Sequence, residues 1–164
     1  FLPEDRKIQG LLRELSLKLN VTITSLARMS RLGWMKPAAI NSVSQEYVQQ
    51  LNIVPPNLER RVRNLSGGNQ QKVVLAKWLC ASSSILIFDE PTRGIDIGAK
   101  ADIYNLMDKL AGQGRSIIMV SSELPEILRM SHRILVMREG AVVKELARSE
   151  ANQQTILHYA TGGH

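Results

Sequence analysis

The sequence predicts an α/β fold, with a mostly parallel sheet joined to an α-helical subdomain. Two short apolar runs bounded by turn residues, at 85–88 and 116–121, are typical of buried parallel strands. A segment with helical periodicity lies between them, and the order strand, helix, strand favours a parallel sheet. The preceding part of the chain shows mostly helical spacing. We therefore expect a helical part at 1–82 and a strand-containing part at 83–164.

Length and composition are those of a single globular domain. The chain has 164 residues, of which 44% are hydrophobic and 22% are charged. Only 4% are aromatic, so the core must consist mainly of aliphatic side chains. The single cysteine, Cys80, excludes an internal disulfide and is expected to be a buried thiol. The chain begins at Phe1 without an initiator Met, which predicts that it is part of a longer protein.

The charge balance permits several kinds of partner. The formal net charge is +6, and Arg60, Arg61 and Arg63 lie close together in the sequence. Such a balance allows nucleic acid, anionic lipid or phosphate ligands, but surplus Lys and Arg are also ordinary on a solvated surface. No basic stripe interleaved with aromatic residues indicates binding of single-stranded nucleic acid. Residues 1–164 contain neither a signal-peptide pattern nor an apolar run near the ~18 residues of a membrane span.

Helix signals recur along the helical part. A mixed segment at 11–19 leads into a predicted helix at 21–29. Pro37 suits the first position of the next helix, which Pro55-Pro56 stops, and an extended connector follows. Ser66 begins a further helix, which ends at about Cys80.

The strand-containing part alternates strands and helices. Turn residues separate these elements, among them Gly112, Gly114 and the pair Glu139-Gly140. Ser149 is expected to cap the last helix. The expected strands are 85–88, 116–121, 133–137 and 141–144, and the expected helices are 97–111, 124–130 and 149 to about 160.

The segment 65–72 combines a serine N-cap with two glycines at a helix start. Ser66 can cap the helix, and Gly67 and Gly68 leave the first backbone amides uncovered. These amides, together with the positive end of the helix dipole, form a ready site for an anion. The alternative is a Ser-Gly-Gly turn that merely enters a helix.

Two acidic residues, Asp89 and Glu90, follow the first core strand. Ligands of open α/β sheets gather outside the carboxyl ends of the strands. Asp89 suits Mg²⁺, which takes a few oxygen ligands and keeps its waters. Glu90 can orient or deprotonate a water that attacks a phosphate. Taken singly, each is equally an acidic residue that faces solvent at a strand end.

In combination, these segments resemble the nucleotide-binding subunit of an ATP-binding cassette (ABC) transporter. Residues 65–72 resemble the signature motif of that family, 85–90 its Walker B strand and 91–96 its D-loop. The resemblance implies a partial P-loop NTPase (RecA-like) core with a helical subdomain that carries the signature. The segments 3–7 and 121–126 are similar to the second cassette of ribose-, xylose- and galactose-type importers, whose ATPase polypeptide carries two fused cassettes.

The resemblance also implies roles for individual residues. Glu90 would be catalytic and Asp89 would hold Mg²⁺. The residues expected to bind ATP are Ser66, Gly67, Gly68, Asn69, Gln70, Asp96, Ser122 and Glu4.

Three departures from the family pattern weaken the site on this chain. The phosphate loop Gly-x-x-x-x-Gly-Lys-Ser/Thr is absent from the sequence, so we expect poor binding of Mg-ATP and an isolated chain that is inactive. Ser122 replaces the histidine that contacts the γ-phosphate, and Glu4 replaces the glutamine of the Q-loop. We therefore expect the intact signature, Ser66, Gly67 and Gly68, chiefly to serve ATP held by a partner cassette.

The implied partners are a second cassette, fused in the parent chain, and membrane permease subunits. A periplasmic or extracellular sugar-binding protein would take part indirectly, and the chain would lie peripherally on the cytoplasmic face of the membrane. Residues 22–57 would face the permease, with Trp34, Met35 and Lys36 as docking candidates. The alternative is an ABC-type ATPase that acts on nucleic acid or the ribosome. The segments at 4–7 and 122–126 fit the importer better, so no nucleic-acid partner is expected.

Overall fold

The computed structural model describes residues 1–5, 9–31 and 34–162, except for the side chain of Arg31. The chain forms two compact units, Phe1–Ile118 and Met119–His164. This division differs from the expected boundary after residue 82, which rests on the change from helical to strand patterns rather than on compactness and stays a prediction. Within the described ranges, none of the helices has the length and apolarity needed to cross a membrane.

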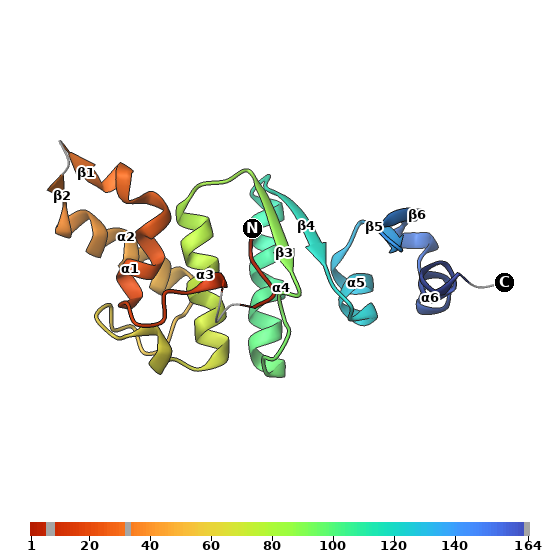
Figure 1. Ribbon diagram of the computed structural model, residues 1–164, viewed down its shortest axis with the longest axis horizontal. Coiled ribbons are helices and arrows are strands. Elements are labelled where there is room, and N and C mark those ends of the chain that lie inside the picture. Colours follow the sequence, from red (N-terminus) through yellow and green to blue (C-terminus); the bar gives the residue numbers. More distant parts are fainter. Residues whose placement is uncertain (6–8, 32–33, 163–164) are drawn as a thin grey trace. The chain divides into compact units, whose positions relative to one another are not determined.

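The elements follow the expected order of helices and then mixed strands and helices (Figure 1). The first unit contains α1 (Leu17–Thr22), the 3₁₀ helix η2 (Ile23–Met29), β1 (Ser30–Arg31), β2 (Trp34–Met35), α2 (Pro37–Gln50), the 3₁₀ helix η3 (Val62–Asn64), α3 (Gly67–Cys80), β3 (Ile85–Asp89) and α4 (Ile97–Gly112). The strand β4 (Ser116–Val120) ends that unit and begins the second, which contains α5 (Leu124–Met130), β5 (Arg133–Arg138), β6 (Ala141–Ala147), the 3₁₀ helix η4 (Arg148–Glu150) and α6 (Gln153–Thr161).

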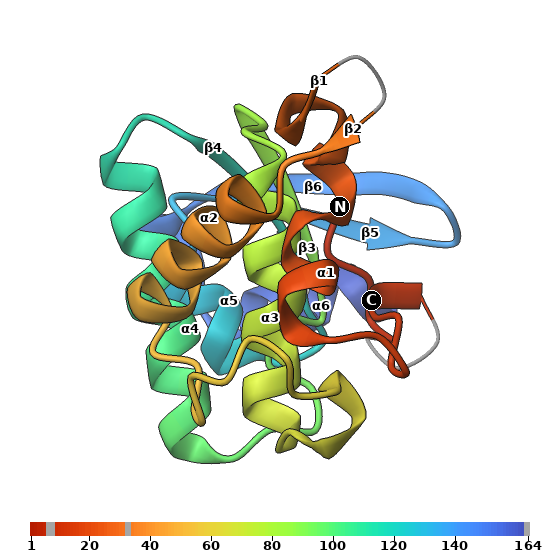
Figure 2. The same cartoon turned by 90° about the vertical axis from the view of Figure 1, so that its left-hand side faces the viewer.

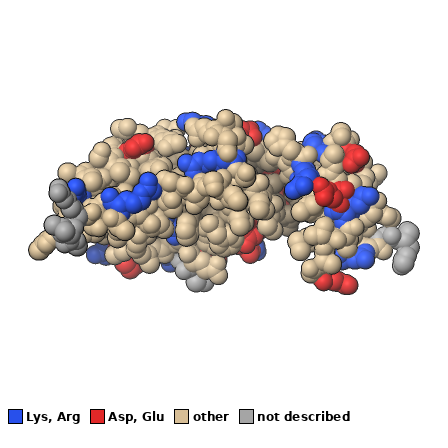
Figure 3. Space-filling view, turned by 90° about the horizontal axis from the view of Figure 1, so that it is seen from above, with Lys and Arg blue, Asp and Glu red and all other residues tan. Residues whose placement is uncertain are grey.

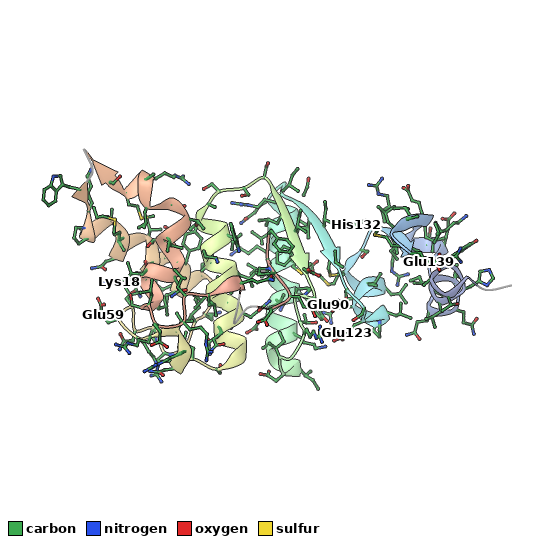
Figure 4. All side chains as sticks on the ribbon, in the orientation of Figure 1. Lys18, Glu59, Glu90, Glu123, His132 and Glu139 are labelled. Atoms are coloured by element: carbon green, nitrogen blue, oxygen red, sulfur yellow. The ribbon has the colours of Figure 1, made fainter. Side chains whose placement is uncertain are left out.

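Helix α3 is the centre of the helical half. Its side chains Val73, Val74 and Ala76 are buried, and α1, α2 and η2 pack against it (Figure 2). Cys80 at its end is buried, as expected. On the outer side of the helical half, Lys18 forms an ion pair with Glu59 (Figure 4).

The predicted helix at 21–29 is only partly correct. The α-helix begins at Leu17 and ends at Thr22, and Ile23–Met29 is a 3₁₀ helix. The hydroxyls of Thr24 and Ser25 donate to the carbonyls of Lys77 and Cys80, each at 2.8 Å. These bonds to the end of α3 favour the tighter 3₁₀ path over a continued α-helix.

Lys77 is a buried lysine that ties the N-terminal segment to α3. Its Nζ donates to the carbonyl of Gly10 at 2.5 Å and lies 4.8 Å from the centre of the Trp78 ring. Burial lowers the pKa of Lys77 below its usual value. By contrast, Trp34 on β2 is 81% exposed.

The strand β3 pairs with β4 and with the N-terminal segment. The amide of Leu2 donates to the carbonyl of Ile87 at 2.7 Å, and Leu2 forms a parallel bridge to Phe88. Phe88 is buried, whereas Ile87 is 37% exposed and Ile85 57%. In β4, Ile118 is 53% exposed. Both strands were expected to be buried throughout, and that expectation is wrong, because only one face of this small sheet is covered.

In the second unit, β5 and β6 form the expected hairpin. They pair antiparallel from Arg133↔Ala147 to Arg138↔Ala141, and Glu139-Gly140 makes the turn with positive φ at both residues. The inward side chains of the hairpin pack on α6 around Ile156.

The expected cap of the last helix is wrong. Asn152 rather than Ser149 caps α6, and its Oδ1 accepts the amide of Thr155 at 2.8 Å. Ser149 lies in the preceding turn η4, so it cannot reach the first amides of the helix. The α/β class and the helices α2 to α5 are confirmed.

Candidate functional site

Ser66 caps α3, as expected. Its backbone is extended (φ −62°, ψ 160°), and its Oγ accepts the backbone amide of Asn69 at 3.4 Å and the side-chain Nδ2 of Asn69 at 2.9 Å. The Oδ1 of Asn69 in turn accepts the amide of Val54 at 2.8 Å. The side chain of Asn69 thus braces the cap against the connector after α2. Ser66 itself is exposed at the start of the helix.

Gln70 lies beneath this helix start rather than on its surface. It is 5% exposed, and its Nε2 donates to the carbonyls of Leu65 at 3.1 Å and Val62 at 3.3 Å. The side chain therefore holds the segment that enters the helix. Its expected contact with nucleotide stays a prediction.

The start of α3 lies unusually close to α4. A Cβ placed on Gly68 would stand 2.9 Å from the Cβ of Ala99, which is closer than side-chain carbons pack. Four residues further along α3, Lys72 forms an ion pair with Asp102 of α4 at 2.8 Å. Gly68 is thus needed for the approach of two helices as well as for uncovered amides.

Asp89 is the last residue of β3, and Glu90 follows it directly. Figure 4 labels Glu90 at this end of the strand. Asp89 and Glu90 are both half-buried, and Glu90 has φ +45°, a conformation that costs a non-glycine residue about 1 kcal/mol or more. Among the described residues, no three His, Cys, Asp or Glu side chains converge as metal ligands. Mg²⁺ commonly uses only one or two protein carboxylates beside phosphate and water, so the donors at Asp89 and Glu90 fit it.

The loop between Glu90 and α4 is fastened at several points. Arg93 forms an ion pair with Glu4, the residue expected at the Q-loop position. The carbonyl of Pro91 accepts the Nε2 of Gln71 at 2.9 Å. Asp96 caps α4, and its Oδ1 accepts the amide of Ala99 at 2.8 Å. This cap is a structural role for Asp96, and its expected contact with nucleotide stays a prediction.

Ser122 belongs to the second unit, where it is exposed. The neighbouring Ser121 donates to the buried carboxylate of Glu126 at 2.5 Å and accepts the amide of Glu123 at 3.0 Å. The first unit holds every other residue that the sequence assigned to the site.

Sequence reasoning gave no role to Gln71, Arg93 or Glu126. Gln71 and Arg93 lie within the longer segments 65–72 and 91–96, and the sequence predicts no separate role for either residue. Nothing in a sequence distinguishes a buried glutamine from an exposed one, and the partner of Gln71 is 20 residues away.

The arginines before the signature are partly neutralised. Arg63 binds both carboxylate oxygens of Glu14, at 2.9 and 3.0 Å, and Arg61 lies 3.6 Å from the same carboxylate. On the face seen in Figure 3, Lys and Arg side chains are scattered and Asp and Glu side chains lie among them. Neither observation indicates a continuous basic surface.

Comparison with known proteins gives a consistent result. The profile of the ABC transporter family matches residues 4–93. A ribose import ATP-binding protein of Shouchella clausii is 51% identical over 163 residues, which are 99% of this chain and 33% of that protein. A putative ribose/galactose/methyl galactoside import ATP-binding protein of Halalkalibacterium halodurans is 50% identical over 99% of this chain and 31% of its own length. The chain thus spans about a third of the length of these relatives.

Solved structures have the same fold. A putative metal-chelate type ABC transporter in an inward-facing conformation matches with a TM-score of 0.78 at 16% identity, over 93% of this chain and 60% of that one. The dimeric bacterial cassette MJ0796 matches with a TM-score of 0.71 at 24% identity, over 85% of this chain and 59% of that one. At these identities the likeness concerns the fold alone.

Proposed function

This chain belongs to the ABC transporter family, and we propose that it is part of the ATP-hydrolysing subunit of a sugar importer. The observation that carries the proposal is identity of about half the residues, over 99% of the chain, with proteins named for ribose or galactose import. The substrate class follows from those names. The cofactors would be ATP and Mg²⁺.

Within that subunit, we propose that Ser66, Gly67 and Gly68 complete an ATP site on a partner cassette. The exposed hydroxyl of Ser66 and the first amides of α3 are donors suited to a phosphate. The braces from Asn69 and Gln70 support this role, because they hold the helix start in place before a ligand arrives.

The site on this chain's own cassette would be degenerate. Asp89 would hold Mg²⁺, which would supply charge neutralisation at the phosphates, and Glu90 would orient the attacking water. Glu4 would add a carboxylate where the family has an amide, and Ser122 lacks the ring nitrogen of a histidine. Repulsion between Glu4 and phosphate would weaken binding, although its ion pair with Arg93 offsets part of that charge.

Permease subunits would be the membrane partners, and the chain would lie peripherally on the cytoplasmic face. The exposure of Trp34 (81%) and Met35 (45%) supports a docking role for the β1–β2 hairpin, because large apolar side chains in contact with water favour burial by a partner.

The test compares two substitutions in the complete importer, reconstituted with its permease in vesicles. We expect Ser66→Arg to abolish sugar uptake, because the long cation fills the space beside the helix start. Glu90→Gln should reduce uptake much less. Ser149→Arg, the same change at an exposed serine of η4, serves as the control and should retain uptake. Equal loss from Ser66→Arg and Glu90→Gln would contradict the asymmetric arrangement.

The alternative is an ABC-type ATPase that acts on nucleic acid or the ribosome. The net charge of +6 allows it, but Glu14 pairs with two of the clustered arginines and reduces the charge available to a phosphate backbone. Co-purification of the complete protein with a permease supports the importer, whereas co-purification with RNA supports the alternative.

A further inference from the structure

Gln71 makes a contact between α3 and the loop that follows Glu90. Its side chain is 3% exposed, and its Nε2 donates to the carbonyl of Pro91 at 2.9 Å. The amide orientation follows from the partner, because a carbonyl oxygen at that distance requires a donor. The bond joins the second turn of the signature helix to the residue next to Glu90.

This glutamine is poorly explained by stability alone. Its Oε1 is buried and has no hydrogen-bond partner among the described residues. A buried polar atom without a partner is unfavourable, and an apolar side chain of the same shape in such a place is often neutral or stabilising. Methionine would fill the same space without that unpartnered oxygen. The useful property of glutamine here is therefore its bond to the loop.

The same loop is fastened on its other side to the N-terminal segment. Arg93 pairs with Glu4, and the intervening Thr92 is 1% exposed. The loop thus lies between the helix start at Ser66 and the expected Q-loop position at Glu4. The bond from Gln71 to Pro91 therefore connects the helix start to the backbone beside Glu90.

We propose that Gln71 is a positioning residue that holds the signature helix start against the loop that follows Glu90. The bond to Pro91 sets the position from which Ser66 meets a nucleotide held by the partner cassette, so turnover at that partner site depends on it. The inference rests on the proposed function, because it takes the start of α3 as the place where a partner's nucleotide binds.

The test uses Gln71→Met in the complete importer assembled with its permease, with ATPase kinetics as the readout. We expect kcat to fall at least about fivefold, with KM for ATP changed less than about twofold, because the lost bond positions a group rather than binding substrate. The Tm should stay within about 4 °C of the wild type. The matched control is Asp102→Asn, which weakens another contact of α3 by removing the charge that pairs with Lys72. It should leave kcat unchanged.

Hydrogen exchange in the complete importer gives a second readout. The amide of Arg93 donates to the carbonyl of Glu90 at 3.1 Å. We expect Gln71→Met to accelerate its exchange about tenfold and Asp102→Asn to leave it unchanged.

The outcomes separate the inference from the proposed function. If Ser66→Arg abolishes ATPase activity while Gln71→Met keeps the wild-type kcat, the positioning role is overturned and the proposed function stands. If Ser66→Arg itself is active, the proposed completion of a partner's ATP site fails, and the positioning role of Gln71 fails with it. A loss of kcat that accompanies a larger fall in Tm overturns the positioning role, because it makes Gln71 a stabilising residue only.

Discussion

Gly68→Ala should destabilise the chain even without nucleotide. The new Cβ would stand 2.9 Å from that of Ala99, so the two helices must separate by about 0.5 Å to reach the 3.4 Å of ordinary contact. Overpacking of this kind lowers the free energy of unfolding by about 1–3 kcal/mol, whereas replacing a helical glycine by alanine raises it by about 0.5–1 kcal/mol. We expect a net loss of stability of about 1–2 kcal/mol. Thermal unfolding followed by circular dichroism should show this loss as a fall in Tm of about 2–8 °C.

Two further variants isolate the contact. Gly112 is also helical, but no atom lies within 4 Å of its added Cβ, so Gly112→Ala should raise the Tm by about 1–4 °C. Ala99→Gly should cost about 1 kcal/mol alone and yet restore stability in the Gly68→Ala background. If the Gly68→Ala variant is as stable as the Gly112→Ala variant, the close approach of Gly68 to Ala99 is refuted. It is also refuted if the effects of Gly68→Ala and Ala99→Gly on the free energy of unfolding are strictly additive in the double variant.

Two other outcomes are expected of the 164-residue chain itself. It should bind Mg-ATP only weakly in calorimetry, because its sequence lacks the phosphate loop, and a micromolar Kd would contradict this. Burial lowers the pKa of Lys77, so between that folded value and the usual 10.5 the unfolded chain binds more protons and stability rises with pH. The stability advantage of the wild type over Lys77→Met in urea unfolding should therefore grow as the pH rises toward 10.5. A constant difference would rule out the lowered pKa; the raised pKa of Tyr47 is common to both proteins and cancels.

Local signals predicted the parts of the fold that local interactions determine. The start of α3 follows from Ser66, and that of α2 from Pro37, because capping and fixed φ act within one turn. The hairpin turn at Glu139-Gly140 follows in the same way from a glycine with positive φ.

Features that depend on distant partners could not be predicted. The apolar runs of β3 and β4 indicated strands correctly, but the burial of each face depends on what packs there, and Ile85 and Ile118 are exposed. Ser149 and Asn152 are both good caps, and the path of the preceding turn chooses between them. In the site, the bond from Gln71 to Pro91 exists only in the folded chain.

The two tryptophans of the chain differ in their surroundings, and this difference can be measured by fluorescence. Trp34 is almost fully in water on β2, whereas Trp78 is partly buried with the cation of Lys77 4.8 Å from its ring centre. Water shifts indole emission to the red, and a nearby charge changes its intensity. The unmodified chain therefore carries two native fluorescent reporters, one for the surroundings of β2 and one for the contact between α3 and the N-terminal segment.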